Sequence, residues 1–407
     1  MDSQIHLNNT TQFDFIIAGA GCAGLSLLYQ ILQSPSLKEK QILVVDKSFQ
    51  KSNDRTWCFW EQGEGDFEIL VNKQWEHISV HNGNFNKTLA TDPFTYKMIQ
   101  GIDYYKYIID FAKTFHNVHW REAHIVKIET GTQNGIVHFE SGKTAVAPFV
   151  FSSIVPEKYQ LAIDTTEQVM NTISTKQPFL WQHFKGIIVE FDMPVFDTAI
   201  ARLMDFNVPQ EGATAFMYVL PINTNKALIE YTLFSEKILS KSAYNAALLV
   251  YLDKYITNNN PNAQYKITHE EFGAIPMTHF SFSTHSNFIY PIGTLSGAVK
   301  ASTGYAFQFI QAQSKQIVNQ IEKGLPIDTS MHKTRHRFYD AVLLYILKHH
   351  KMEGKEIFTR IFKKNKAATI FKFLSNTSNF IDDINVMRSL PTRIFLPAAI
   401  RVLFRRR

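Results

Sequence analysis

The sequence predicts an α/β fold in which a Rossmann-like domain is interrupted by an antiparallel β-sheet and followed by a helical C-terminal region. Three patterns predict it. A short apolar strand, a glycine-rich turn and an apolar helix open the chain between residues 13 and 32. Strand-like runs separated by turns fill residues 182–271, and a second strand, glycine cluster and helix follow at 287–321. Beyond about residue 332 the apolar residues recur at helical spacing, so the chain of 407 residues divides into two or three units.

The first glycine cluster is typical of a dinucleotide site. Gly19, Gly21 and Gly24 have the spacing G-x-G-x-x-G between an apolar strand and an apolar helix. The first glycine allows a tight turn, the second lets the backbone around Ala20 approach a pyrophosphate, and the third lets the helix pack on the strand. The free N–H groups and the dipole at the helix N-terminus favour the phosphates.

A second apolar run, Ile42–Val45, ends at Asp46. An acidic residue at this distance from the glycines binds a ribose hydroxyl in dinucleotide-binding folds. Asp46 and the following Lys47 are therefore candidate cofactor-binding residues. The alternative is a glycine-rich turn that binds nothing, which leaves the agreement of strand, glycines, helix and acid unexplained.

The second glycine cluster indicates which nucleotide is bound. In FAD enzymes a distal strand, turn and helix of this kind supports the flavin ring and the ribityl phosphate, and NAD-only Rossmann proteins have no need of it. The N–H groups at the start of the following helix favour negative charge on a reduced flavin. The alternative is an ordinary loop in which serine and threonine cap the helix. The candidate cofactor-binding residues here are Gly293, Gly297, Thr303, Gly304 and Tyr305.

These patterns divide the chain. We expect a discontinuous FAD-binding domain at 1–60, 97–155 and 272–330, a β-rich substrate domain at 61–96 and 156–271, and a helical, basic region at 331–407. Three local elements are also predicted: a hairpin within 81–100, a helix at Asp103–Phe115, and antiparallel strands at Val118–Ile128 and Gly135–Glu140.

The C-terminal region carries most of the surplus positive charge. The net charge is +6, and no acidic residue follows Asp383, whereas six arginines do. A basic amphipathic tail predicts attachment to membrane surface lipids that are anionic. The alternative is a helix docked on the protein's own core. Nucleic acid is not expected, because the basic stretch lacks interleaved aromatics and no nucleic-acid-binding motif is present. The apolar residues at helical spacing are Leu396, Ala399, Ile400, Leu403 and Phe404.

The cysteine content and the hydropathy of the chain indicate its cellular compartment. Cys22 and Cys58 form no C-x-x-C pair, so neither a disulfide framework nor a metal site is predicted, which fits a reducing compartment. The first residues lack the apolar core of a signal peptide, and no apolar run is long enough to span a bilayer. We expect a cytoplasmic protein that is peripheral on the inner face of the cell membrane.

Several short blocks resemble bacterial lycopene beta-cyclases, an FAD-dependent carotenoid cyclase family. The blocks run in the family's order from residue 13 to about 315: GAGCAGLSL, then Asn53–Trp57, Phe216–Pro221, Ile229–Thr232, Gly273–Met277 and Ser302–Tyr305. The resemblance implies an FAD-binding fold of the glutathione-reductase type with a β-sheet substrate domain. It implies that the ψ-ends of lycopene or of other acyclic carotenes are closed to β-rings, which gives β-carotene from lycopene via γ-carotene. It also implies that the flavin must be reduced, with NAD(P)H as reductant, although the reaction is an isomerisation.

Ring closure requires a proton on a terminal carbon–carbon double bond, so the acid must be neutral and dry. Glu230 is the only acid in the apolar run ALIEYTLF and matches the family's strand glutamate, which the resemblance implies is essential. The alternative is a glutamate on the solvated face of a strand. Asp205 matches a family aspartate that positions or deprotonates; its alternative is a turn-capping role before Asn207. A reduced flavin would place negative charge beside the cation.

Two other functions remain open. A flavin oxidoreductase that acts on an isoprenoid, either a reductase or a monooxygenase, would use the same fold. Gly293-Thr294 replaces the G-D pair that many flavoprotein hydroxylases carry, which argues against a monooxygenase. A flavin-binding sensor without catalytic activity would not need Glu230 in an apolar strand.

Overall fold

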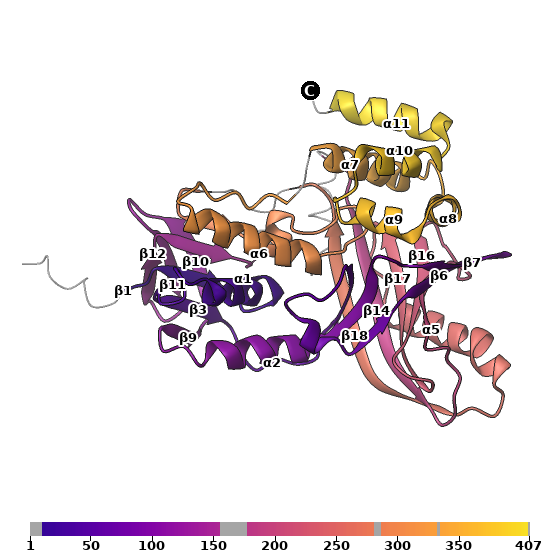
Figure 1. The fold of residues 1–407 in the computed structure, drawn as a ribbon, viewed down its shortest axis with the longest axis horizontal. Coiled ribbons are helices and arrows are strands. Elements are labelled where there is room, and N and C mark those ends of the chain that lie inside the picture. Colours follow the sequence, from indigo (N-terminus) through magenta and orange to yellow (C-terminus); the bar gives the residue numbers. More distant parts are fainter. Residues whose placement is uncertain (1–9, 155–176, 281–285, 332–333, 406–407) are drawn as a thin grey trace, which may run out of the picture.

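The nucleotide-binding part is built on a parallel sheet. The computed structural model describes residues 10–154, 177–280, 286–331 and 334–405 (Figure 1). The sheet has five strands in the order β19-β13-β2-β3-β9, and every neighbouring pair is parallel. Near-continuous apolar runs suit the three central strands β13, β2 and β3, because helices or a second sheet cover both faces. The strands are β2 (Phe15–Ala18), β3 (Ile42–Asp46), β9 (Val118–Glu122), β13 (Phe149–Ser152) and β19 (Ile289–Pro291).

Helices and a small sheet cover the two faces of this parallel sheet. Helices α1 (Cys22–Gln33), α2 (Gly101–Ala112) and α6 (Phe307–Glu322) share one apolar core with β2 and β3. The other face packs on a sheet with the order β1-β12-β11-β10. Its strands are β1 (Thr10–Gln12), β10 (Ile125–Thr130), β11 (Gly135–Phe139) and β12 (Thr144–Ala147).

The strand predicted at Val118–Ile128 is two strands. The chain leaves the regular strand geometry at residues 123 and 124, so β9 joins the parallel sheet beside β3 and only β10 pairs antiparallel with β11. The prediction of one antiparallel strand was wrong because a continuous alternating pattern does not mark a change of sheet. The predicted helix at Asp103–Phe115 is α2, which begins two residues earlier and ends at Ala112.

A seven-stranded sheet forms the β-rich part, in the order β18-β14-β17-β16-β15-β6-β7. Its neighbours are antiparallel except β15 and β6, which are parallel. The hairpin predicted within 81–100 lies earlier in the chain, because β6 begins at His77 and pairs with β7, whereas the end of the predicted segment is β8, which joins a three-stranded sheet, β4-β8-β5. The strands are β4 (Thr56–Glu61), β5 (Lys73–Trp75), β6 (His77–Asn82), β7 (Phe85–Ala90), β8 (Thr95–Gln100), β14 (Leu180–Phe191), β15 (Ile200–Asp205), β16 (Thr214–Pro221), β17 (Lys226–Ser235) and β18 (Tyr265–Met277).

Two features of this sheet differ from the expected division of the chain. The boundary at 271/272 falls inside β18, because this strand continues to Met277. Helix α5 (Lys241–Tyr255) interrupts the strands and packs on one face of the sheet. Ser240 caps this helix, and its buried residues Tyr244, Leu248, Tyr251 and Leu252 lie at helical spacing.

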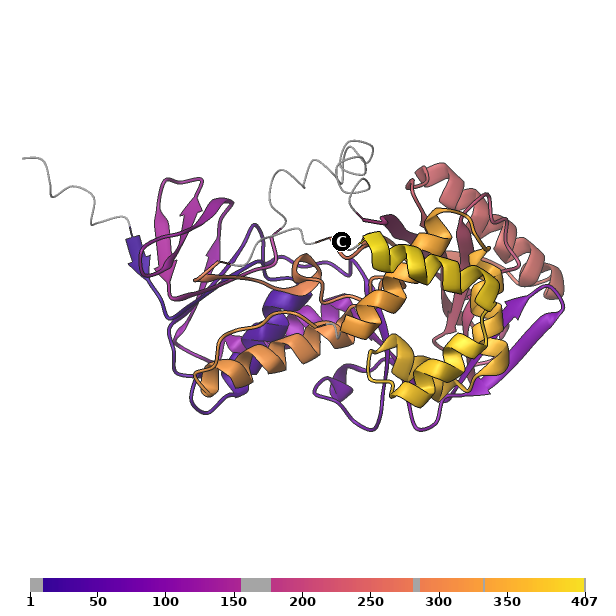
Figure 2. The same ribbon diagram turned by 90° about the horizontal axis from the view of Figure 1, so that it is seen from above.

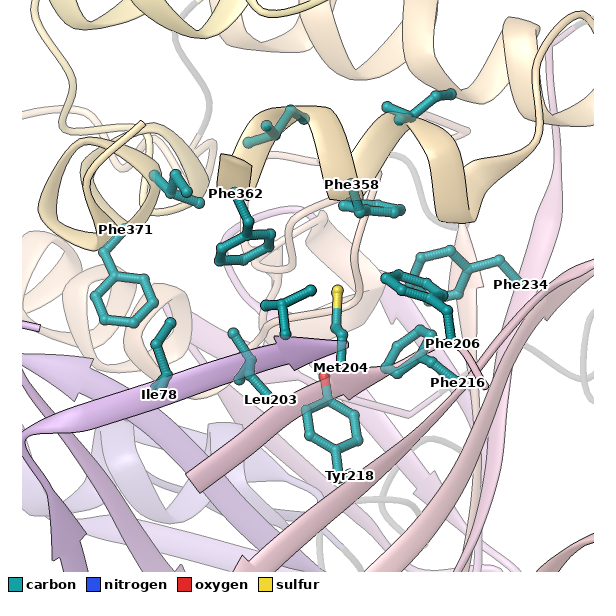
Figure 3. Close-up of a cluster of buried hydrophobic side chains, with 14 of the residues drawn as sticks. Ile78, Leu203, Met204, Phe206, Phe216, Tyr218, Phe234, Phe358, Phe362 and Phe371 are labelled. Carbon is teal, nitrogen blue, oxygen red and sulfur yellow. The ribbon is translucent and has the colours of Figure 1, made fainter. Parts of the chain in front are cut away.

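Five helices cover the opposite face of the seven-stranded sheet, as Figures 1 and 2 show. They are α7 (Thr334–Lys348), α8 (Gly354–Lys364), α9 (Ala367–Leu374), α10 (Phe380–Arg388) and α11 (Thr392–Arg405). In Figure 3, Phe358 and Phe362 of α8 point at Leu203 and Met204 of β15, with Tyr218 of β16 beyond them. Among the described residues, none of the helices combines the length and apolar character needed to cross a membrane.

Helix α11 docks on the protein through one of its faces. It packs on α7, and Ala398 and Val402 are buried in the shared core. Most of the predicted apolar stripe nevertheless points outward, because Leu396, Ile400, Leu403 and Phe404 are exposed on the face away from α7. One helix therefore has two apolar faces, and only one of them is buried.

Candidate active site

The first glycine turn is shaped to hold a phosphate group. Gly19 has a φ of +103°, and a Cβ on Gly24 would lie 1.9 Å from the carbonyl oxygen of Gly19, so both positions require glycine. By contrast, a Cβ on Gly21 would meet nothing within 4 Å, and α1 begins directly after it without a side-chain cap. The N-terminus of α1 thus faces open space that is suited to an anion.

Asp46 lies beside this turn. Its Oδ2 accepts a hydrogen bond from the backbone N–H of Ala20 at 2.6 Å and forms an ion pair with Lys51 Nζ at 3.2 Å. The carboxylate is partly exposed at the carboxyl end of β3, and Lys47 is exposed next to it. The structure therefore places the candidate cofactor-binding residues Asp46 and Ala20 in contact, and it adds Lys51, which the sequence did not single out.

The second glycine cluster lies against the first. A Cβ on Gly293 would lie 2.6 Å from the Cβ of Ala23 in the first turn of α1, while one on Gly297 would meet nothing within 4 Å. Gly293 and Gly304 have φ values of +67° and +73°. The loop therefore follows α1 closely and leaves space at Gly297.

Ser302 and Thr303 do not cap α6, so the alternative reading of this loop is not the observed one. The helix starts after Ala306 without a side-chain cap, and the Ser302 hydroxyl donates to Asp340 at 2.7 Å. Next to Gly304, the Thr303 hydroxyl and the Gln182 amide oxygen are buried without a hydrogen-bond partner among the described residues. Buried polar atoms of this kind require a partner. The open glycine turns and these polar atoms together fit a dinucleotide that runs from α1 to Gly304.

Glu230 lies on the inner face of the seven-stranded sheet. Its neighbours on β17, Leu228 and Phe234, belong to the core beneath the C-terminal helices, whereas Ile229 and Tyr231 face α5. The Thr232 hydroxyl donates to Glu230 Oε1 at 2.5 Å. Burial, reinforced by the charge of Glu271, raises the pKa of Glu230 to about 8. Glu230 is therefore half-buried beneath the C-terminal helices rather than on a solvated face, and its raised pKa favours the neutral carboxyl near pH 7.

Aromatic and thiol side chains surround this carboxyl. Tyr218 is directly opposite Glu230 on β16, and its hydroxyl lies 3.3 Å from that of Tyr305. The Trp60 ring packs edge-on against Tyr305 with centroids 4.6 Å apart. Burial raises the pKa values of Tyr218, Tyr305 and Cys58, so all three stay neutral near pH 7. Ring faces beside a developing cation stabilise it.

Glu271 is a site residue that the sequence reasoning missed. Gly186 of β14 is the register partner of both Glu230 and Glu271, so the two glutamates point to the same face on either side of a glycine. Glu271 is 5% exposed, and burial raises its pKa to about 7. The sequence signal that could have found it is the pair of adjacent acids in β18. Adjacent residues of a strand point to opposite faces, so when one face of the sheet is covered, only one of Glu270 and Glu271 faces solvent.

Asp205 does not join Glu230. Its carboxylate accepts hydrogen bonds from Tyr251 of α5 at 2.7 Å, from Arg202 at 3.1 Å and from the N–H of Asn207 at 3.0 Å. Tyr251 belongs to the core on the α5 face of the sheet, opposite the face that carries Glu230. The turn-capping alternative is therefore the observed one; in addition, Asp205 pairs with Arg202 on the same strand and accepts the Tyr251 hydrogen bond that links α5 to the sheet.

Asp205→Asn is expected to destabilise the fold without changing chemistry. The variant loses the charge that Arg202 and Tyr251 contact, which costs about 1–3 kcal/mol of unfolding free energy. Denaturant titration measures this loss, and turnover per folded molecule should match that of the wild type. A variant of normal stability with lost turnover would assign Asp205 a catalytic role instead.

An apolar cavity of about 260 Å³ lies between β15, the second glycine loop and the C-terminal helices. Tyr305 lines it on the side of the glycine loop, and Met387, Leu390 and Leu396 line it on the side of α10 and α11. The cavity thus reaches from the aromatic group around Glu230 to the two helices with exposed apolar residues. Within the described residues, no cluster of His, Cys, Asp and Glu is arranged to hold a metal ion.

Solved structures share this fold at low sequence identity. A flavoprotein/dehydrogenase from Cytophaga hutchinsonii is 10% identical with a TM-score of 0.58, and the match covers 97% of this chain and 100% of that one. An HpxO variant from Klebsiella pneumoniae complexed with FAD is 12% identical with a TM-score of 0.62 and coverages of 90% and 98%. A geranylgeranyl bacteriochlorophyll reductase-like protein from Thermoplasma acidophilum is 11% identical with a TM-score of 0.53 and coverages of 97% and 96%. These likenesses confirm the predicted FAD-binding flavoprotein fold.

The family comparison covers nearly the whole chain. No curated protein matches the sequence. Residues 14–399, however, match the family described as lycopene cyclase protein, and this range contains both glycine clusters, the strand with Glu230, helices α7 to α10 and the first part of α11. The family predicted from the short sequence blocks is thereby confirmed: the chain belongs to the lycopene cyclase family.

Proposed function

We propose that this protein is a lycopene beta-cyclase that uses bound, reduced FAD and closes the ψ-ends of lycopene to β-rings by acid–base catalysis. The observation that carries the proposal is Glu230, a half-buried carboxyl with a raised pKa that lies opposite Tyr218 and near Tyr305 and Trp60 on the covered face of the sheet. An alkene is a weak base, so its protonation requires a neutral, positioned acid in a dry site. The ionised carboxylate and the ring faces then lie beside the cation.

The residues around the two glycine clusters would hold the cofactor. The N-terminus of α1 at Gly21 would take the pyrophosphate, Asp46 a ribose hydroxyl, and the polar atoms near Gly304 the flavin ring. When bound and reduced, FAD supplies negative charge near the reacting carbons. Tyr305 belongs to the same loop as Gly304 and contacts Tyr218, which lies opposite Glu230. The loop thus connects the cofactor site to the acid.

Product analysis tests the proposal against the oxidoreductase alternative. Purified protein with FAD, NAD(P)H and lycopene in liposomes should yield γ-carotene and then β-carotene. A cyclase needs only enough NAD(P)H to keep the flavin reduced, whereas a reductase consumes one NAD(P)H for each double bond. Consumption of one reductant per product bond, or a product with added hydrogen or oxygen, would contradict the proposal.

We infer further that α10 and α11 attach the protein to the cytoplasmic face of the membrane in which the substrate is dissolved. The exposed apolar side chains of these helices lie among arginines, and Phe404 is 69% exposed. Such a surface combines apolar insertion with attraction to anionic lipid. The exposed residues are Phe380, Ile381, Met387, Leu396, Ile400, Leu403 and Phe404.

Replacing Leu403 and Phe404 with serine is expected to weaken binding to anionic liposomes by about tenfold or more, since full burial of each side chain contributes about 1.5–3 kcal/mol. Flotation measures the binding, which should also weaken as salt rises. Leu249→Ser with Val250→Ser is the matched control, because these exposed apolar residues lie on α5. Equal flotation of the two double variants would contradict attachment through α11.

A further inference from the structure

We propose that Glu271 is the charge partner of Glu230: the two carboxyl groups hold one proton between them, and the ionised Glu271 keeps that proton on Glu230 until the substrate takes it. The inference rests on the proposed role of Glu230 as the acid. It assigns a function to a residue that no sequence motif pointed to.

The strand register places the pair. Glu230 on β17 and Glu271 on β18 flank β14, and Gly186 is the partner of both. Neighbouring strands lie about 4.8 Å apart, so the two backbones are roughly 10 Å apart with both side chains on one face. A Cβ on Gly186 would lie 2.9 Å from Glu271 Cγ and 3.1 Å from its Oε1. Any larger residue at 186 would separate the two carboxyl groups.

The surroundings decide which carboxyl ionises first. The Thr56 hydroxyl of β4 donates to Glu271 Oε2 at 2.9 Å, and Arg55 favours the charged form while Asp54 opposes it. Glu230 accepts from the Thr232 hydroxyl, and no cation from the described part of the chain is among the causes of its pKa shift. Burial raises the pKa of both carboxyl groups. Because Thr56 and Arg55 favour the ionised form of Glu271, the shared proton resides on Glu230.

The other groups that face Glu230 leave this balance unchanged. They are the Cys58 thiol of β4 and the hydroxyls of Tyr218 and Tyr305. Burial raises the pKa of each of these groups, so they are neutral near pH 7. Glu271 is then the neighbour whose charge acts on Glu230, and a like charge disfavours ionisation of the second carboxyl.

The proton balance of ring closure fits a pair with one proton. Glu230 gives its proton to a carbon of the terminal double bond, which forms a C–H bond and leaves two carboxylates beside the cation. Closure forms a C–C bond, and a ring carbon then loses a proton to a carboxylate. The pair again holds one proton, and no oxidant or reductant is consumed.

Glu271→Gln removes the charge but keeps the shape, so Glu230 should ionise more readily. We expect the pH above which turnover falls to be about one unit lower than in the wild type. Infrared titration of the resting protein should show the same decrease for the protonated-carboxyl band that is missing in Glu230→Gln. Glu271→Asp keeps the charge and should restore most of the midpoint.

Glu270→Gln is the matched control. Glu270 precedes Glu271, is 49% exposed and pairs with Lys185 at 2.9 Å. Its replacement should leave both midpoints unchanged. If Glu271→Gln does not fold, Gly186→Ala displaces the Glu271 side chain and should lower the midpoint in the same direction.

Midpoints that stay at the wild-type value in turnover and in the infrared titration would overturn the pairing. An infrared midpoint that decreases in a protein that forms no β-rings would support the pairing and refute the proposed function. The two inferences therefore fail separately.

Discussion

Glu230→Gln should lose ring closure by about 10²–10⁴-fold while keeping the fold and bound FAD. Glutamine has nearly the shape of glutamate and can still accept the Thr232 hydrogen bond, so the strand should remain intact. It offers no acidic proton, and an alkene, being a poor base, places the loss at the upper end of this range. Single-turnover formation of β-rings from lycopene, with the flavin reduced beforehand, measures the loss directly.

A label and a control complete this test. In deuterated water the wild type should place deuterium on the ring carbon next to the gem-dimethyl centre. A reductase would instead transfer deuteride from labelled NAD(P)H to carbon. Glu236→Gln is the control, because Glu236 is 49% exposed and directly follows the same strand. Product with cofactor-derived label, or near-normal cyclisation by Glu230→Gln, would refute Glu230 as the acid.

The nucleotide-binding part of the fold was predictable from the sequence, because the local backbone geometry of its first turn allows only glycine at particular positions. Gly19 and Gly24 must be glycine in this turn. Gly19 has a positive φ, and a Cβ on Gly24 would lie 1.9 Å from the Gly19 carbonyl oxygen. The split of 118–128 into β9 and β10 was not predictable in the same way. Alternation reports which residues face a sheet but not which sheet they face, and that depends on partners distant in the sequence.

The candidate site was predictable only in part. Glu230 stood out because it is a single acid in an apolar strand. Burying such a group costs free energy, which partners elsewhere in the fold must offset. Asp205 showed the same local signal, yet its partner is Tyr251 of α5, on the opposite face of the sheet. Glu271 was hidden next to Glu270 in a polar run. Its role follows from the pairing of β14 with both β17 and β18, which joins residues far apart in the chain.

Gly21→Leu should abolish FAD binding and leave the apoprotein stable. A Cβ at Gly21 would meet no atom of the described residues within 4 Å, and Gly21 has a φ of −87°, which any residue can adopt. The leucine would instead fill the space in front of the first N–H groups of α1, where the pyrophosphate would lie. We expect at least a 100-fold weaker affinity, about 2.7 kcal/mol, measured by flavin fluorescence titration.

The comparison of two glycines in one turn makes this result specific. Gly24→Ala places a methyl group 1.9 Å from the Gly19 carbonyl oxygen, so it should lower the thermal stability of the apoprotein as well as its affinity for FAD. Gln33→Leu adds the same bulk at the exposed C-terminal end of α1 and should change neither property. If Gly21→Leu binds FAD as tightly as Gln33→Leu does, the phosphate does not lie at this turn, because the leucine and the pyrophosphate cannot share that space.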